Sequence, residues 1–153
     1  MWPETIKIFI LDDFESIRTM LKAHIKAMGH KGQIFEASNV KNAKALLQQA
    51  VAKKVKIDFI LSDWNLPDGN GLDFLKFTKT LPEFKDTPFL MVTTENETTK
   101  IIQALGLGAS NYLIKPWTPA ELKEKMLTAW FKHHPNTAPT AKKKIALRKR
   151  TVV

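Results

Sequence analysis

The sequence predicts a doubly wound α/β fold, in which a parallel sheet of five strands carries helices on both faces. Short and largely apolar runs of strand length alternate five times with segments whose apolar residues recur at helical spacing. Strands that are apolar throughout are typical of parallel sheets, because helices cover both sides of such a sheet. A chain of 153 residues is long enough for one domain with its own core.

The five predicted strands are apolar runs that end in polar or turn-forming residues. They are expected at residues 6–11, 33–37, 57–63, 89–92 and 109–114. Pro88 opens the fourth run, and a Pro/Asp/Gly/Asn cluster at residues 67–71 forms the loop after the third.

A helix is predicted after each strand from apolar residues spaced three and four apart. The apolar faces are, helix by helix, Ile17, Met20, Leu21, Ile25 and Met28; Ala43, Leu46, Leu47, Ala50 and Val51; Leu72 and Leu75; Ile101, Ile102 and Leu105; and Leu122, Met126, Leu127, Trp130 and Phe131. Gly29 should end the first helix, Ser38 or Asn39 should cap the second, and Gly106 or Gly108 should end the fourth.

The last helix has the clearest start signal in the chain. Thr118 is expected at the N-cap, Pro119 at the first helical position and Glu121 three residues after the cap. The Thr and Glu side chains can then accept hydrogen bonds from backbone N–H groups that the first helical turn leaves unpaired.

The positive charge is concentrated in the last twenty residues. The net charge is +9, and residues 134–153 hold six Lys and Arg side chains and no acidic one, which leaves +3 for residues 1–133. The sequence therefore predicts a domain at 1–133 and a basic, disordered tail at 134–153. Such a tail can remain solvated, or it can bind a nucleic acid backbone or an anionic membrane. It is too short for a folded DNA-binding domain.

Several other classes of protein are disfavoured. The chain has no cysteine, so disulfides and thiolate chemistry are absent. The start of the chain does not resemble a signal peptide, and the apolar runs are well short of the roughly 20 residues that span a bilayer. We therefore expect a soluble, cytoplasmic protein.

Polar side chains follow four of the predicted strands: Asp12 and Asp13, Asp63, Thr93, and Lys115. In a parallel sheet these positions share one edge, which is where α/β folds place their ligands. Like charges about 4 Å apart repel by roughly 4 kcal/mol at an effective dielectric constant near 20, so three carboxylates favour a bound cation. An all-oxygen site suits Mg²⁺, and the added hydroxyl and ammonium favour phosphoryl transfer to a carboxylate.

Structural roles are the alternative for each of these residues. Asp63 could cap a turn, Asp12 and Asp13 could cap the following helix, and Thr93 could simply end a strand. The grouping of all of them at one sheet edge favours the functional interpretation.

With these residues in place, the chain resembles the receiver domain of two-component response regulators, most closely the chemotaxis-type, single-domain (CheY-like) members. The resemblance covers about residues 5–133. It rests on Asp12-Asp13 after the first strand, the stretch Asp63-Trp64-Asn65-Leu66-Pro67 after the third, Thr93 after the fourth and Lys115-Pro116 after the fifth. Leu66 and Trp117 are small departures, where the family often has Met and Phe. The resemblance implies a flavodoxin-like (βα)5 fold.

The resemblance also implies roles for the site residues. Asp63 would be phosphorylated, and Asp12, Asp13, Asp63 and the Asn65 backbone carbonyl would hold Mg²⁺. Lys115 would bind the acyl phosphate, next to a cis Lys115-Pro116 bond.

Four residues would link phosphorylation to its effects. Thr93 would swing toward the phosphoryl group and let Tyr112 turn inward, although Tyr112 could instead be a half-buried strand residue. Asn65 and Glu95 occupy positions that tune hydrolysis in the family. The remodelled surface would be the face of the fourth helix, fifth strand and fifth helix.

The implied partners are a sensor histidine kinase or phosphotransfer protein, a downstream protein that contacts this face, and a phosphatase. The protein would be a monomer or a phosphorylation-dependent dimer, and a role in chemotaxis or motility follows by analogy alone. It would be a regulator and not an enzyme, with self-phosphorylation and self-dephosphorylation as its only chemistry. One alternative is a phosphohydrolase with an Asp nucleophile, but that class needs a second Asp where this chain has Asn65. The other is a regulator that binds nucleic acid or an anionic surface through its tail.

Overall fold

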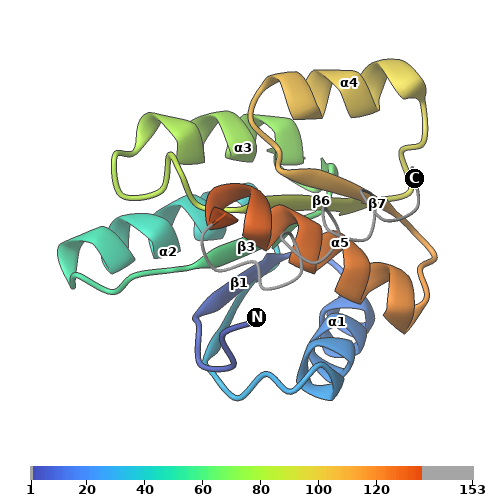
Figure 1. The fold of residues 1–153 in the computed structure, drawn as a ribbon. Coiled ribbons are helices and arrows are strands. Elements are labelled where there is room, and N and C mark those ends of the chain that lie inside the picture. The colour runs from blue at the N-terminus through green and yellow to red at the C-terminus, as the bar shows by residue number, and fades with distance from the viewer. Residues whose placement is uncertain (1, 136–153) are drawn as a thin grey trace, which may run out of the picture.

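The computed structural model describes residues 2–135, and they form a three-layer α/β fold. Five parallel strands make the central sheet in the order β2-β1-β3-β6-β7 (Figure 1). The strands are β1 (Ile8–Leu11), β2 (Ile34–Ala37), β3 (Phe59–Ser62), β6 (Phe89–Thr93) and β7 (Asn111–Ile114). This is the flavodoxin-like strand order, and it confirms the predicted fold class. The tail predicted at 134–153 lies almost wholly outside the described residues.

The helices divide between the two faces of the sheet. On one face lie α1 (Glu15–Ala27) and α5 (Pro119–His133), whose buried side chains share a core cluster. On the other lie α2 (Val40–Ala52), α3 (Gly71–Thr80) and α4 (Thr98–Gly106), as Figure 1 shows. All five helices follow the strands as predicted, and none in the described part of the chain is long and apolar enough to cross a membrane.

Each central strand supplies side chains to both cores. In β1, Phe9 and Leu11 join the core under α2, α3 and α4, while Ile8 and Ile10 join the core under α1 and α5. All four are fully buried. Burial of alternate residues on both faces is the reason that these strands are apolar throughout.

The helix boundaries follow the predicted signals, and the structure decides between the two predicted caps of α2. Asn39, not Ser38, caps α2, because its side chain accepts a hydrogen bond from the Asn42 N–H. The predicted capping box at α5 is present, with Thr118 and Glu121 each accepting from the other's backbone N–H. In contrast, Phe14 at the N-cap of α1 provides no side-chain cap.

A small hairpin occupies the loop predicted after the third strand. β4 (Asn65–Leu66) pairs antiparallel with β5 (Gly69–Asn70). The Asp68 carboxylate at its turn accepts hydrogen bonds from the N–H groups of Val40 and Lys41, at 2.8 and 2.9 Å. The loop next to Asp63 is therefore attached to the start of α2.

Candidate phosphoacceptor site

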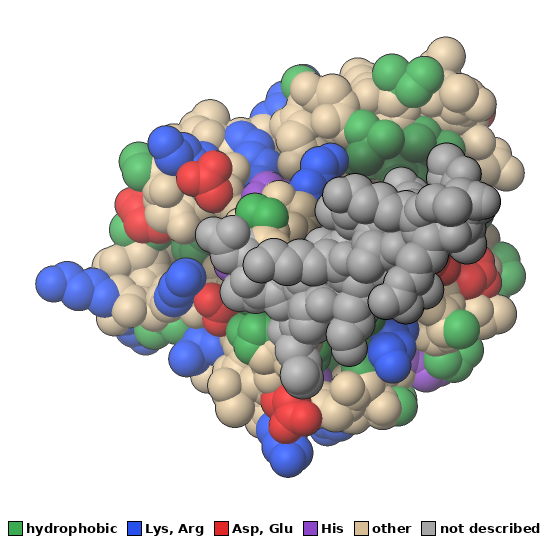
Figure 2. All heavy atoms as spheres, in the orientation of Figure 1, with side chains coloured by type: hydrophobic (Ala, Val, Ile, Leu, Met, Phe, Trp, Pro, Cys, Tyr) green, Lys and Arg blue, Asp and Glu red, His purple; other side chains and the backbone are tan. Residues whose placement is uncertain are grey.

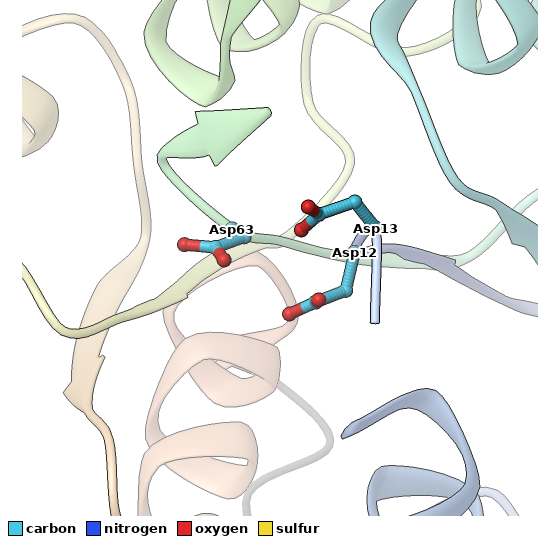
Figure 3. A group of neighbouring side chains, drawn as sticks. All are labelled: Asp12, Asp13 and Asp63. Atoms are coloured by element: carbon cyan, nitrogen blue, oxygen red, sulfur yellow. The ribbon is translucent and has the colours of Figure 1, made fainter. Parts of the chain in front are cut away.

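The three aspartates predicted for the site come together at the carboxyl end of the sheet. Asp12 and Asp13 follow β1, and Asp63 follows β3, which is the neighbour of β1 in the sheet. One carboxylate oxygen of each lies within 4.8 Å of the others (Figure 3). The grouping arises because the register pairs Leu11 with Ser62, so the two strands end level with each other.

Lys115 completes the group from the end of β7. Its Nζ lies 2.7 Å from Asp12 Oδ2 and 2.9 Å from Asp63 Oδ2, and the three side chains are 10%, 2% and 8% exposed. Burial of the ammonium opposes its charge, but the two ion pairs prevail and raise the pKa of Lys115. The Lys115-Pro116 bond is cis, as the resemblance implies.

Asp63 is held by the backbone of the residues that follow it. Asp63 Oδ1 accepts a hydrogen bond from the Trp64 N–H at 2.6 Å and a longer one from the Asn65 N–H at 3.4 Å. The turn also requires a glycine at position 71, because a Cβ there would lie 1.9 Å from the Asp63 carbonyl oxygen. These contacts fix the direction of the Asp63 carboxylate.

The aspartates fit a hard divalent cation. Among residues 2–135, Asp13 Oδ1 is buried and has no hydrogen-bond partner, which is costly for a carboxylate oxygen unless a cation binds it. Asp12 Oδ1 accepts from the Phe14 N–H at 2.9 Å, so this carboxylate has a local structural role as well. Burial raises the pKa of Asp12, although the hydrogen bonds from Lys115 and Phe14 favour its charged form. An all-oxygen donor set of this kind suits Mg²⁺.

The predicted switch residues form a chain of contacts beside the aspartates. Thr93 is fully buried at the end of β6, and its Oγ1 accepts from the Glu95 N–H at 3.3 Å. Tyr112 is 6% exposed, and its hydroxyl donates to the Glu95 carbonyl oxygen at 2.7 Å. The Asn65 side chain donates to Glu95 Oε1 at 2.9 Å. All eight predicted site residues therefore lie at this end of the sheet, and Tyr112 is buried rather than half-buried.

Two residues contact the site without having been predicted from the sequence. Arg18 of α1 donates to the Asp12 carbonyl oxygen at 2.7 Å and to Glu36 at 3.0 Å. Lys100 of α4 donates to Glu95 Oε2 at 2.8 Å. Both are basic residues in the first turns of helices that follow site strands, and that position is the only signal in the sequence that could have indicated them.

An apolar cleft of about 380 Å³ borders the site on its α1 side. It is lined by Phe14, Ile17, Met20, Thr94, Lys115, Pro116 and Trp117. Phe14 and Met20 are 60% and 45% exposed, so two large apolar side chains of this cleft face solvent. The Lys115 side chain thus contributes both to this cleft and to the aspartate group.

Comparison with known proteins gives the family. The response regulator receiver domain model matches residues 8–127. A chemotaxis protein CheY homologue of Campylobacter jejuni is 35% identical over 121 residues, which cover 79% of this chain and 89% of the relative. The chemotaxis protein CheY-3 of Vibrio cholerae is 37% identical over 123 residues, which cover 80% and 90%.

A solved structure agrees with these relatives. The chemotaxis response regulator CheY4 of Vibrio cholerae superposes with a TM-score of 0.69 at 30% identity, over 82% of this chain and 98% of that one. The chain belongs to the response regulator receiver family, and within it to the CheY-like group. Such receivers are signalling proteins activated by phosphorylation, not catalytic enzymes, and they interact with a histidine kinase or phosphotransfer protein and with a downstream target.

Proposed function

We propose that Asp63 is the phosphoacceptor and that it takes a phosphoryl group from a phosphohistidine of a kinase or phosphotransfer protein. The observation that carries the proposal is the position of its carboxylate, which pairs with the Lys115 ammonium and lies within 4.8 Å of the Asp12 and Asp13 carboxylates at the carboxyl end of the sheet. One Asp63 oxygen attacks the phosphorus, the phosphorus–nitrogen bond breaks, and the electron pair returns to the imidazole, which takes a proton from water.

The neighbouring side chains have separate roles in this reaction. The Trp64 N–H holds Asp63 Oδ1 in place. Lys115 pairs with Asp63 in the unphosphorylated protein, and we propose that it pairs with a phosphoryl oxygen afterwards. Asp12, Asp13, Asp63 and the Asn65 carbonyl would hold Mg²⁺, which neutralises charge on the transferring phosphoryl group when it is bound.

Asn65 distinguishes this site from that of an Asp-based phosphohydrolase. Its amide does not ionise near neutral pH and so cannot act as a general acid or base, and it already donates to Glu95. A general acid/base is therefore missing at this position, which supports slow self-dephosphorylation rather than turnover of external substrates.

The phosphate donor would approach over the apolar cleft. The cleft is next to Lys115, and Phe14 and Met20 offer apolar area that a helix of the donor protein could cover. A substitution such as Phe14→Ala should slow phosphotransfer from a protein donor and leave phosphorylation by a small phosphodonor unchanged.

The output surface would be the face of α4, β7 and α5. Ile102 and Leu105 of α4 are 63% and 41% exposed, and Figure 2 shows hydrophobic side chains gathered near this helix. In this structure Tyr112 already lies inward, in the position that the resemblance associates with the phosphorylated state. We propose that Thr93 and Tyr112 stabilise this inward arrangement when Asp63 is phosphorylated, and that the downstream protein binds the resulting face.

We further propose that residues 1–133 are the receiver unit and that the basic residues from 134 onward are separate from it. A truncation at His134 should leave phosphorylation unchanged. If the truncated chain keeps phosphorylation but loses a salt-sensitive binding to DNA that the full chain shows, nucleic-acid contact is assigned to the tail.

The decisive experiment is phosphorylation of the purified protein by phosphoramidate, which has a phosphorus–nitrogen bond, with and without Mg²⁺. Mass spectrometry should show a singly phosphorylated species that requires Mg²⁺ and is absent in Asp63→Asn. Asp58→Asn is the matched control. Asp58 lies at the opposite end of β3, and its carboxylate accepts a hydrogen bond from the Lys7 N–H. No phosphorylated wild-type protein, or an equal yield in Asp63→Asn, would refute the proposal.

A further inference from the structure

A bridge of three side chains lies beside the phosphoacceptor site. Asn65 Nδ2 donates to Glu95 Oε1 at 2.9 Å, and Lys100 Nζ donates to Glu95 Oε2 at 2.8 Å. The three residues belong to β4, to the loop after β6, and to α4. Because both Glu95 oxygens are engaged, the carboxylate is held from two sides.

Lys100 has a second contact that directs it toward the site. Its ammonium lies 5.8 Å from the ring centroid of Trp64, within the range of a cation–π interaction. The backbone N–H of Trp64 donates to Asp63 Oδ1. Lys100 thus contacts both Glu95 and the residue that follows Asp63.

Glu95 also connects this bridge to the switch residues through its backbone. Its N–H donates to Thr93 Oγ1, and its carbonyl oxygen accepts from the Tyr112 hydroxyl. The position of the Glu95 side chain is therefore tied to the position of both switch residues.

We infer that Lys100 is a positioning residue for Glu95, and that it prolongs the life of the phosphorylated state by keeping the Asn65–Glu95 bridge closed. The inference rests on the proposed phosphorylation of Asp63. In hydrolysis a water oxygen attacks the phosphorus, the bond from phosphorus to the Asp63 oxygen breaks with its electron pair returning to the carboxylate, and the water proton goes to solvent. Without Lys100 the Glu95 side chain loses its second anchor, and water gains access to the phosphorus.

The exposure of the Glu95–Lys100 pair determines how its role in positioning can be measured. Glu95 and Lys100 are partly exposed, with side chains 23% and 34% accessible, so the pair alone contributes little to folding stability. An exposed pair is also screened by salt. A role in positioning therefore predicts a salt-dependent lifetime of the phosphorylated protein with almost unchanged stability.

The test measures the decay of phosphorylated protein after removal of phosphoramidate, by mass spectrometry in the presence of Mg²⁺. Lys100→Ala should decay about two- to fivefold faster than wild type, which is the factor expected from losing one exposed ion pair. Lys100→Arg should restore most of the lifetime, because it keeps the charge. Lys44→Ala is the matched control, since Lys44 is a lysine of α2 whose ammonium lies 5.3 Å from the Phe77 ring centroid.

Two further measurements ask whether Lys100 acts through Glu95. In a Glu95→Gln background, Lys100→Ala should have no additional effect on the decay rate. Raising the salt concentration should accelerate wild-type decay toward the Lys100→Ala rate and leave that variant unchanged. An unaltered decay rate in Lys100→Ala, or an equal further acceleration in the Glu95→Gln background, would overturn the inference. Failure of the wild type to be phosphorylated at all would instead refute the proposed function.

Discussion

Lys115 Nζ donates to Asp63 Oδ2 at 2.9 Å, joining two residues that lie 52 positions apart in the sequence. The same ammonium is 2.7 Å from Asp12 Oδ2. One cation thus holds together the ends of three strands, β1, β3 and β7.

Lys115→Met should destabilise the metal-free protein by about 3 kcal/mol, because it leaves two buried carboxylates side by side without a cation. Met keeps most of the length and apolar stem of the side chain. The measurement is urea unfolding in the presence of a chelator, with Lys115→Arg as the charge-preserving control. Added Mg²⁺ should recover part of the loss. Equal unfolding midpoints for wild type and Lys115→Met would show that the ion pairs contribute nothing.

Asp13→Asn should abolish most of the stabilisation of the protein by Mg²⁺. Asp13 Oδ1 is buried without a hydrogen-bond partner in the part of the chain that the structure describes, so we expect it to be a metal ligand rather than a structural group. In wild type, each tenfold rise in free Mg²⁺ above the dissociation constant should add about 1.4 kcal/mol to the free energy of unfolding.

Thermal unfolding across a Mg²⁺ titration measures this effect directly. Asp73→Asn provides the control, because Asp73 is an exposed aspartate on α3. The assignment of Asp13 as a ligand fails if the Asp13→Asn protein responds to Mg²⁺ as strongly as wild type does.

The sequence allowed prediction of the strands, the helices and the strand-end residues, because each depends on a local pattern. Apolar runs mark the strands, and parallel strands bring Asp12, Asp63 and Lys115 to one edge whatever their distance in the chain. Contacts between loops follow no such pattern. The attachment of Asp68 to the start of α2 and the contact of Lys100 with Glu95 depend on how the loops after β3 and β6 fold back. These contacts are visible only in the three-dimensional structure.

Gly71→Ala should cost roughly 1–3 kcal/mol of stability and should slow phosphorylation of Asp63 by phosphoramidate. A Cβ at position 71 would overlap the Asp63 carbonyl oxygen, so the turn that aims the carboxylate must shift. Gly106→Ala is the matched control, because a Cβ there meets nothing within 4 Å and lies in helix α4.

The control should be neutral or gain about 0.5–1 kcal/mol, since Ala favours a helix over Gly. Urea unfolding and the initial rate of phosphorylation are measured on both variants. If the two glycine variants behave alike, the close approach at position 71 has no functional consequence.

Tyr112 should titrate far above an ordinary tyrosine. Burial, with additional contributions from the charges of Glu95 and Asp63, raises the pKa of Tyr112 to about 12. The group is neutral when protonated, so the folded state binds its proton more tightly than the unfolded state does. The resulting stability is fully present below the unfolded value near pH 10 and is lost as the pH rises from there to about 12.

The chain contains a single tyrosine, so its absorbance near 295 nm reports this one group. We expect a titration midpoint close to pH 12 in the wild-type protein and no such transition in Tyr112→Phe. Circular dichroism at each pH shows whether the protein is still folded when the hydroxyl ionises. A midpoint near pH 10 in protein that is still folded would mean that the ring spends most of its time outside the core. The inward position of Tyr112 would then be a minor state, and phosphorylation of Asp63 would be needed to populate it.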